Sequence, residues 1–143
     1  MAARSAREAF YKHMAMRGLR RTPQREAILT EFLRWERHCS AEELYDALRR
    51  KGQRVGSSTV YRTLRLLAEC GLAREVEFDD GITRFEHLYQ HDHHDHLVCL
   101  KCGSLIEFSS PTIERIQAQV AAEHGFEPKR HKMEIYGLCH HCR

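Results

Sequence analysis

The stretch SSTVYRTLRLLAECGLAREVEFDDGITRFEH, residues 57–87, joins one segment suited to a helix with two segments suited to strands. Apolar residues recur at helical spacing over residues 57–70, which begin with two serines and are followed by a glycine. The two runs within residues 73–87 flank Asp-Asp-Gly, a typical signal for a hairpin turn. A helix followed by a hairpin predicts the recognition helix and the wing of a winged helix-turn-helix.

Three further helices are predicted ahead of this stretch, over residues 3–17, 22–36 and 40–52. Thr22 and Pro23 are a typical helix start, and Ser40 with Glu43 is a capping box. Short helices followed by a hairpin describe a winged helix-turn-helix. An arbitrary small helical core is the alternative, and helix content alone does not separate the two.

The charges divide the chain into halves of opposite sign. Residues 1–75 hold 16 Lys/Arg and 9 Asp/Glu, whereas residues 76–143 hold 7 Lys/Arg and 11 Asp/Glu. Nine of the eleven histidines also lie in the second half. The basic half and the polar start of the predicted recognition helix favour binding to DNA, and the acidic, histidine-rich half favours binding of cations.

The second half is predicted to form a small α/β unit with the order strand, strand, helix, strand. Residues 95–108 are suited to two strands joined by a cysteine-containing turn, and residues 126–139 return as a strand. Ser110 and Pro111 are placed to begin the intervening helix, and Gly125 is placed to end it.

The character of the chain changes near residue 88, so we expect two domains, residues 1–88 and residues 89–143. The expected fold class is α+β, a winged helix-turn-helix domain followed by a small α/β domain. No apolar run approaches the roughly 18–20 residues that a membrane span needs, and the basic N-terminus lacks the apolar block of a signal peptide. We therefore expect a cytoplasmic protein without a membrane partner.

Four of the six cysteines form two C-x-x-C pairs, Cys99/Cys102 and Cys139/Cys142. Each pair places two thiolates on a tight turn, and four such sulfurs complete a closed tetrahedral Zn(II) site of the structural type. A predicted helix lies between the pairs and can bring them together. Two unrelated reduced pairs or a redox switch are the alternative. The two histidines between Cys139 and Cys142 are expected to point away from the ion.

The run HDHHDH, residues 91–96, concentrates side chains that bind metals. In a strand, neighbouring side chains point to opposite faces, so His93 and Asp95 would face one way and His94 and His96 the other. One strand would then contribute to two different sites, giving two metals besides the zinc. The alternative is a solvated polar loop, which we favour for the first two residues of the run.

Neither of these pairs completes a coordination sphere, so further ligands must come from elsewhere in the chain. Histidine and carboxylate ligands without thiolate suit Fe(II), Mn(II), Co(II) or Zn(II), and spacing does not choose among these ions. The candidate ligands are Glu86, His87, Glu107, Glu114, His124 and His131.

Several motifs occur here in the order in which they occur in the ferric uptake regulator (Fur) family: SAEELYDAL, STVYRTLRLL, GLAREVEFDDG, RFE, HHDHLVCLKCG, IEF and HGF. The sequence resembles that family from about Gly18 to the C-terminus. The resemblance implies a winged-helix DNA-binding domain followed by an α/β dimerisation domain. It also implies a homodimer that binds palindromic, AT-rich double-stranded operator DNA when metal is bound, and that typically represses genes for metal uptake.

The resemblance carries three sets of metal ligands onto this sequence. The structural Zn(II) falls on the same four cysteines that their spacing selects. The regulatory site would use His38, Glu86, His94, His96 and Glu107. An additional site in the dimerisation domain would use His93, Asp95, Glu114 and His131.

One part of the regulatory site departs from the family pattern. Residues 86–93 are about one residue longer than in many relatives and contain His87, which is the alternative to Glu86 as a ligand. Peroxide-sensing relatives tend to carry aspartate where this chain has Glu86 and Glu107. The glutamates therefore favour an iron-type regulator that binds Fe(II), with Mn(II), Co(II) or Zn(II) as substitutes.

For DNA, the resemblance points to three side chains. Arg20 would probe the minor groove, because narrow AT-rich grooves attract arginine. Tyr61 would contact thymine methyl groups from the recognition helix, and Arg62 would contact a phosphate or a base. The alternatives are that Tyr61 packs partly in the core and that Arg20 is an ordinary solvated charge.

The competing functions are a zinc-, manganese- or peroxide-sensing regulator of the same family, a metal-dependent hydrolase, and a metal store or chaperone. A hydrolase needs an open coordination position and a nearby base, and no H-E-x-x-H motif is present. A store has no use for the basic half of the chain. We therefore expect a regulator, not an enzyme, without a small-molecule substrate.

Overall fold

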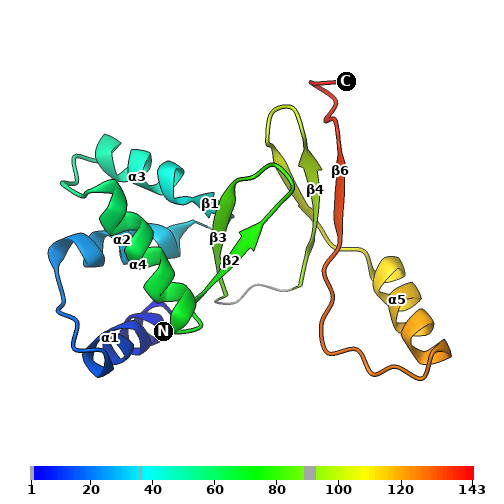
Figure 1. Ribbon diagram of the computed structural model, residues 1–143, viewed down its shortest axis with the longest axis horizontal. Helices are drawn as coiled ribbons and strands as arrows, with labels where there is room; N and C mark the ends of the chain where they lie inside the picture. The colour runs from blue at the N-terminus through cyan, green and yellow to red at the C-terminus, as the bar shows by residue number, and fades with distance from the viewer. Residues whose placement is uncertain (1, 36, 89–92) are drawn as a thin grey trace. The chain divides into compact units, whose positions relative to one another are not determined.

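The structure is a computed structural model that describes residues 2–35, 37–88 and 93–143. The chain divides into two compact units, Met1–His91 and Asp92–Arg143, and each unit has its own three-stranded sheet (Figure 1). This mixture of helices and small sheets confirms the predicted α+β class. The boundary predicted after residue 88, and the surface positions predicted for His91 and Asp92, fall on residues outside the described ranges.

The first unit contains the four predicted helices, whose ends lie within two residues of the predicted ones. They are α1 (Ala2–Met16), α2 (Pro23–Arg34), α3 (Ala41–Arg50) and α4 (Ser57–Glu69). The predicted caps form: the Thr22 hydroxyl accepts from the Arg25 amide at 3.2 Å, and Ser40 and Glu43 complete the capping box. These bonds satisfy backbone donors that the first turn of each helix leaves open.

The sheet of the first unit has the order β1-β3-β2 and is antiparallel. It combines β1 (Cys39–Ser40) with the predicted hairpin strands β2 (Ala73–Glu77) and β3 (Thr83–His87). Gly81 has a φ of 74° in the hairpin turn, a conformation that glycine adopts without strain. The short strand β1, which the sequence pattern did not indicate, pairs Cys39 with Phe85 and so aligns the residue before it with Glu86.

Apolar faces of the four helices and one face of this sheet share a single core. Its fully buried side chains come from every helix and from β3, and include Phe10, Met14, Ile28, Leu29, Phe32, Leu44, Leu48, Val60, Leu64, Leu67 and Phe85. The core packs α4 against the base of the hairpin. Three helices and a hairpin in this arrangement are a winged helix-turn-helix.

The second unit follows the predicted order of strand, strand, helix, strand. Its elements are β4 (Asp95–Cys99), β5 (Leu105–Phe108), α5 (Pro111–Glu123) and β6 (Glu134–Gly137). The central strand β4 pairs antiparallel with β5 and parallel with β6. A parallel pair needs a crossover connection, and α5 lies in that connection.

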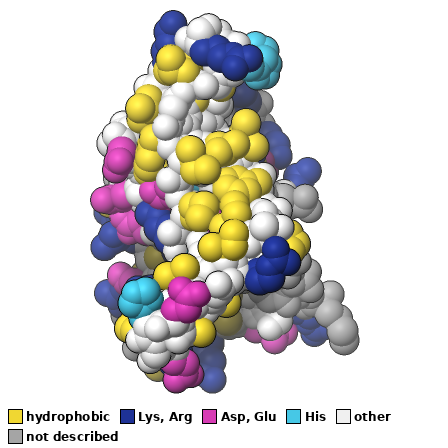
Figure 2. All heavy atoms as spheres, turned by 90° about the vertical axis from the view of Figure 1, so that its right-hand side faces the viewer, with side chains coloured by type: hydrophobic (Ala, Val, Ile, Leu, Met, Phe, Trp, Pro, Cys, Tyr) yellow, Lys and Arg dark blue, Asp and Glu magenta, His cyan; other side chains and the backbone are white. Residues whose placement is uncertain are grey.

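An extensive apolar surface remains exposed on the second unit. No residue of α5 is buried, and Phe126 just beyond it is 71% exposed. On the sheet, Leu97 pairs with Ile106 on one side and with Ile135 on the other, and both isoleucines are about half exposed. Figure 2 shows apolar side chains gathered on this side of the molecule. Surfaces of this kind mark sites of protein association.

Candidate metal centres and nucleic-acid interface

The cysteines of the two C-x-x-C pairs meet at one end of the second unit. The parallel register of β4 and β6, with Cys99 opposite Gly137, brings the turns that follow the two strands to the same end of the sheet. Ligand atoms of all four cysteines lie within 4.8 Å of one another. This register explains why two cysteine pairs separated by 36 residues in the sequence lie close together in space.

The geometry of this cysteine group fits a tetrahedral zinc ion. The sulfurs of Cys102 and Cys139 are 3.8 Å apart, far beyond a disulfide bond, and the cysteines are free. A tetrahedron with Zn–S bonds of about 2.3 Å has an edge of about 3.8 Å. Four thiolates leave no open position, so an ion held here supports the fold and has no place for a substrate.

Backbone amides near the cysteine turns also favour thiolates. Amide groups of Cys102 and Cys139 lower the pKa of Cys99 to about 5, and the Ser104 hydroxyl lowers that of Cys102. The neighbouring Cys139 raises the pKa of Cys142 to about 12. Thiolates this close repel one another, and a divalent cation removes that repulsion.

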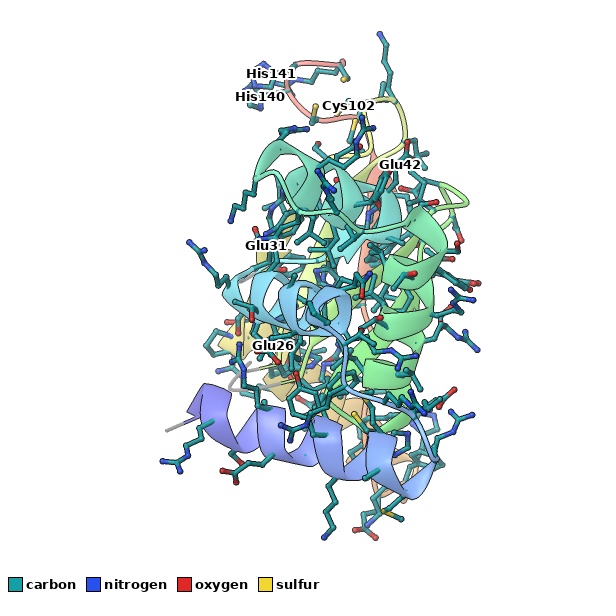
Figure 3. All side chains as sticks on the ribbon, turned by 90° about the vertical axis from the view of Figure 1, so that its left-hand side faces the viewer. Glu26, Glu31, Glu42, Cys102, His140 and His141 are labelled. Atoms are coloured by element: carbon teal, nitrogen blue, oxygen red, sulfur yellow. The ribbon has the colours of Figure 1, made fainter. Side chains whose placement is uncertain are left out.

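His140 and His141 do not belong to the cysteine group. Their rings contact each other, with centroids 3.7 Å apart, and both side chains are exposed. Figure 3 shows the two rings on the outer side of the terminal turn, apart from Cys102. The zinc ligands that the site offers are therefore sulfurs alone.

A second group in the same unit joins His93, Asp95, Glu114 and His131. The His93 Nε2 atom lies 3.3 Å from Asp95 Oδ1 and 3.3 Å from Glu114 Oε1, and His131 Nε2 lies 3.1 Å from the same Glu114 oxygen. Glu114 stands in the first turn of α5, where the Ser110 cap fixes the helix start. Side chains from β4, α5 and the loop before β6 thus converge on one point.

Asp95 supplies the test of whether this second group fits a cation. Its side chain is 1% exposed, and among the described residues neither carboxylate oxygen accepts a hydrogen bond. A buried carboxylate without hydrogen bonds is costly unless a positive charge compensates it. Two imidazoles and two carboxylates suit Zn(II), Mn(II), Co(II) or Fe(II), so the group fits such an ion.

The first unit buries a histidine against a glutamate. The His38 Nε2 atom lies 2.7 Å from Glu86 Oε2, and the two side chains are 1% and 5% exposed. Burial alone raises the pKa of Glu86, but the contact with His38 and the guanidinium of Arg74 outweigh it and lower the pKa to about 2. Glu86 is therefore a carboxylate at neutral pH.

The same strand separates Glu86 from its alternative, His87. Neighbouring side chains of β3 point to opposite faces of the sheet. The Glu86 side chain meets His38, whereas the His87 ring meets Phe32 of the core with centroids 5.9 Å apart. Within the first unit, Glu86 and not His87 is the side chain that accompanies His38.

The second unit places the remaining predicted ligands of the regulatory site together. The rings of His94 and His96 contact each other with centroids 5.0 Å apart, and the Glu107 carboxylate lies 3.7 Å from His94. Glu107 is also directly opposite His96 in the register of β4 and β5. Strand alternation has thus directed His94 and His96 away from the group that contains His93 and Asp95.

The residues predicted to contact DNA are exposed on the first unit. Tyr61 and Arg62 lie near the start of α4, and Tyr61 is 45% exposed although its ring touches Phe85. Arg20 is exposed in the loop before α2, where Arg25 donates a 2.7 Å hydrogen bond to its carbonyl oxygen. This support by Arg25 was not evident from the sequence, because the sequence does not show which backbone carbonyl a long side chain reaches.

A polar depression of about 220 Å³ lies beside these residues. It is lined by Thr22, Gln24, Arg25, Thr59, Arg62 and Thr63. The N-cap and first turn of α2 and the first two turns of α4 contribute these side chains, so hydroxyl, amide and guanidinium groups line the same space. Such a surface is suited to the phosphate backbone of a nucleic acid.

The family model described as the ferric uptake regulator family matches residues 16–136. The chain belongs to the ferric uptake regulator family. A ferric uptake regulation protein of Campylobacter jejuni is 40% identical over 137 residues, which cover 94% of this chain and 87% of that protein. A zinc uptake regulation protein of Mycobacterium tuberculosis is 43% identical over 130 residues, which cover 91% and 99%.

Solved structures of this family have the same fold. The Vibrio cholerae ferric uptake regulator superposes with a TM-score of 0.76 at 40% identity, covering 90% of this chain and 98% of that one. The Helicobacter pylori regulator, described with three functional metal-binding sites, gives 0.87 at 30% identity, covering 99% and 94%.

Members of the ferric uptake regulator family are dimeric, metal-responsive regulators of transcription that bind DNA, and this function also holds for the present chain. The predicted class of function is confirmed, and the hydrolase and storage alternatives are not supported. Zinc and regulatory metal ions are the cofactors of this family. In the described part of the chain, no helix has the length and apolarity to cross a membrane.

Replacing Cys139 by serine is expected to remove the zinc, because three sulfurs no longer close the tetrahedron. Zinc per chain, measured by mass spectrometry of the metal, should fall by one ion relative to the parent protein, and the melting temperature should fall with it. Cys70→Ser is the matched control, since Cys70 lies outside the cysteine group. A Cys139→Ser protein that keeps as much zinc per chain as the parent protein would contradict the assignment.

Replacing His131 by alanine is expected to weaken metal binding to the second group at least about tenfold. Titration of the zinc-loaded protein with Co(II) should show one tight site fewer per chain. His124→Ala is the control, because the His124 ring lies at the end of α5 and contacts the Val120 carbonyl. Loss of Co(II) binding in both variants, or in neither, would argue against this group as a metal centre.

Proposed function

We propose that this regulator responds to Fe(II) in the cytoplasm and represses genes for metal uptake. In its metal-bound form, the homodimer binds palindromic, AT-rich operator DNA. Mn(II), Co(II) and Zn(II) are the substitutes that the same ligands accept. The structural zinc occupies the cysteine group, and the group around Asp95 is an additional site.

The observation that carries this proposal is the clustering of ligands within each unit, of which His38, Glu86 and His96 are buried. The first unit supplies His38 with Glu86, and the second supplies His94 and His96 with Glu107. We assign all five to one regulatory ion. A set of three imidazoles and two carboxylates, without thiolate, is better suited to Fe(II) or Mn(II) than to a structural Zn(II).

The metal acts through the orientation of the two units. An ion with ligands in both units restrains their relative orientation, whereas the metal-free chain samples several orientations. The gain in DNA affinity is limited by how much more tightly the ion binds the DNA-binding orientation than the other orientations. The coupling is reciprocal, so DNA tightens metal binding by the same factor. This is a population shift, and it needs no change inside either unit.

We assign DNA binding to residues 1–88 and dimerisation to residues 89–143. The winged helix-turn-helix and the polar depression beside α4 support the first assignment. The second rests on the exposed apolar side chains of the second unit, namely Leu100, Ile106, Ile116, Val120, Phe126, Ile135 and Leu138. A second copy of the chain buries such a surface at roughly 25 cal/mol per Å² of apolar area.

The two carboxylate ligands favour an iron-type regulator over a peroxide sensor. Peroxide-sensing members tend to carry aspartate at the positions of Glu86 and Glu107, whereas this chain carries glutamate at both. A zinc- or manganese-sensing regulator is the second candidate, since relatives of both names occur among similar proteins and structures. Activation by tight Zn(II) binding together with indifference to Fe(II) would identify the zinc sensor.

In the DNA complex, Arg20 enters the narrow minor groove and Arg25 holds its backbone. Tyr61 contacts thymine methyl groups in the major groove, and Arg62 contacts a phosphate or a base. The exposure of Tyr61, Arg20 and Arg62 in the protein without DNA supports these roles.

Replacing Arg62 by alanine is expected to weaken operator binding about tenfold in the presence of metal, because a charged contact to DNA is lost. Fluorescence anisotropy over a range of salt concentrations should also show a shallower salt dependence. Arg4→Ala removes the same charge from the far end of α1, where Arg4 pairs with Glu8, and should bind normally. Equal binding by all three proteins would exclude α4 from the interface.

Replacing Glu86 by glutamine is expected to weaken binding of the regulatory metal at least about tenfold, because an amide is a poor substitute for a carboxylate ligand. Zinc content should not change. Chelator competition measures the affinity, and anisotropy measures the metal concentration needed for operator binding. Glu75→Gln on β2 is the control, because Glu75 pairs with Arg65 instead. Unchanged metal affinity in Glu86→Gln would refute the assigned site.

A further inference from the structure

The carboxylate of Glu86 has a cationic partner that the proposed regulatory site does not use. Arg74 lies directly opposite Glu86 in the register of β2 and β3, so the two side chains share one face of the sheet. The Arg74 Nη2 atom donates a hydrogen bond to Glu86 Oε1, while Oε2 is in contact with His38. Both oxygens of the carboxylate are therefore engaged.

The two partners in this pair differ in their exposure. The side chain of Glu86 is 5% exposed, whereas that of Arg74 is 55% exposed. A buried carboxylate needs a compensating charge, so Arg74 stabilises Glu86 in the metal-free protein. Because the Arg74 side chain is half exposed, its guanidinium can move from the carboxylate into water. It does not become a buried charge when it does so.

The other arginine on this face of the hairpin is held elsewhere. Arg84 pairs with Asp80 at 2.8 Å and lies over the ring of Phe78. Arg74 is thus the arginine whose charge the structure directs at Glu86.

A metal ion that uses Glu86 must deal with this guanidinium. Arg74 donates a hydrogen bond to a Glu86 oxygen that would otherwise be available as a metal ligand. Its positive charge also repels a divalent cation at short range. Binding therefore has to break the ion pair, and the free energy of that pair is subtracted from the free energy of metal binding. The competition acts on every divalent ion at this position.

We propose that Arg74 is a built-in competitor of the regulatory metal: it neutralises Glu86 in the metal-free protein and sets the metal concentration at which the site fills. The inference rests on the proposed function, because it assumes that Glu86 is a ligand. Arg74 is not itself a ligand, and it acts through Glu86. A purely structural cross-strand pair between β2 and β3 is the reading to be excluded.

The test compares Arg74→Gln with Arg74→Lys and with Arg65→Gln. Arg65→Gln is the matched control, because it removes the same charge from the neighbouring pair with Glu75. Co(II) and Mn(II) affinities are measured on the zinc-loaded full-length dimer by chelator competition, without DNA. Arg74→Gln should bind each ion about three- to tenfold tighter, while Arg74→Lys stays within about twofold of the parent and Arg65→Gln is unchanged. Unchanged or weaker binding by Arg74→Gln would overturn the proposal.

Thermal unfolding gives a second readout that a structural pair would not reproduce. Arg74→Gln should lower the melting temperature of the protein without regulatory metal more than that of the Co(II)-loaded protein, because the pair exists only before the ion binds. Equal losses in the two states would show a structural role and contradict the competition.

Glu86→Gln separates failure of this inference from failure of the proposed function. If Glu86→Gln leaves metal affinity unchanged, the regulatory site itself is wrongly assigned and Arg74 has no metal to compete with. If Glu86→Gln weakens binding and Arg74→Gln does not tighten it, only the competition is refuted.

The double variant Glu86→Gln/Arg74→Gln keeps the test decisive if Arg74→Gln alone does not fold, because it replaces an ion pair by two neutral side chains. Its metal affinity should equal that of Glu86→Gln, since Arg74 acts only through the carboxylate. A lower affinity in the double variant would show that Arg74 assists the metal and would overturn the proposal.

Discussion

The alternation of side chains along β4 is the constraint on which the metal chemistry of the second unit depends. His93 and Asp95 join Glu114 and His131, His94 and His96 join Glu107, and Cys99 at the end of the strand joins the other cysteines. Because β4 is the central strand, its register is fixed by β5 and by β6 together. A slip of one residue would move every ligand to the opposite face.

Charge compensation is built into two of the three groups of ligands. Backbone amides and a hydroxyl favour thiolates among the cysteines, and Arg74 with His38 lies beside the buried Glu86. In these two groups the protein supplies positive charge or hydrogen-bond donors where an ion would bind. Such groups are preorganised for metal, but part of the binding free energy is spent on displacing these partners.

Local signals predicted much of this architecture. The caps at Thr22 and Ser40 and the Asp-Asp-Gly turn act within a few residues, so their helices and hairpin could be derived from the sequence. The two C-x-x-C pairs are also local patterns, so the cysteine group could be predicted from the sequence. The association of His38 with Glu86 depends on the two-residue strand β1, which is too short to leave a pattern. Arg74 was missed because an arginine on a strand looks like any solvated charge until its cross-strand neighbour is known. The resemblance to a family, and not spacing, supplied His38.

The most direct test of the central claim is the affinity of the zinc-loaded dimer for Fe(II), measured anaerobically with and without an AT-rich palindromic duplex. If metal controls DNA binding through the orientation of the two units, the duplex must tighten Fe(II) binding by the same factor by which Fe(II) tightens binding to the duplex. Fe(II) affinity that is identical in the presence and absence of the duplex would contradict the account.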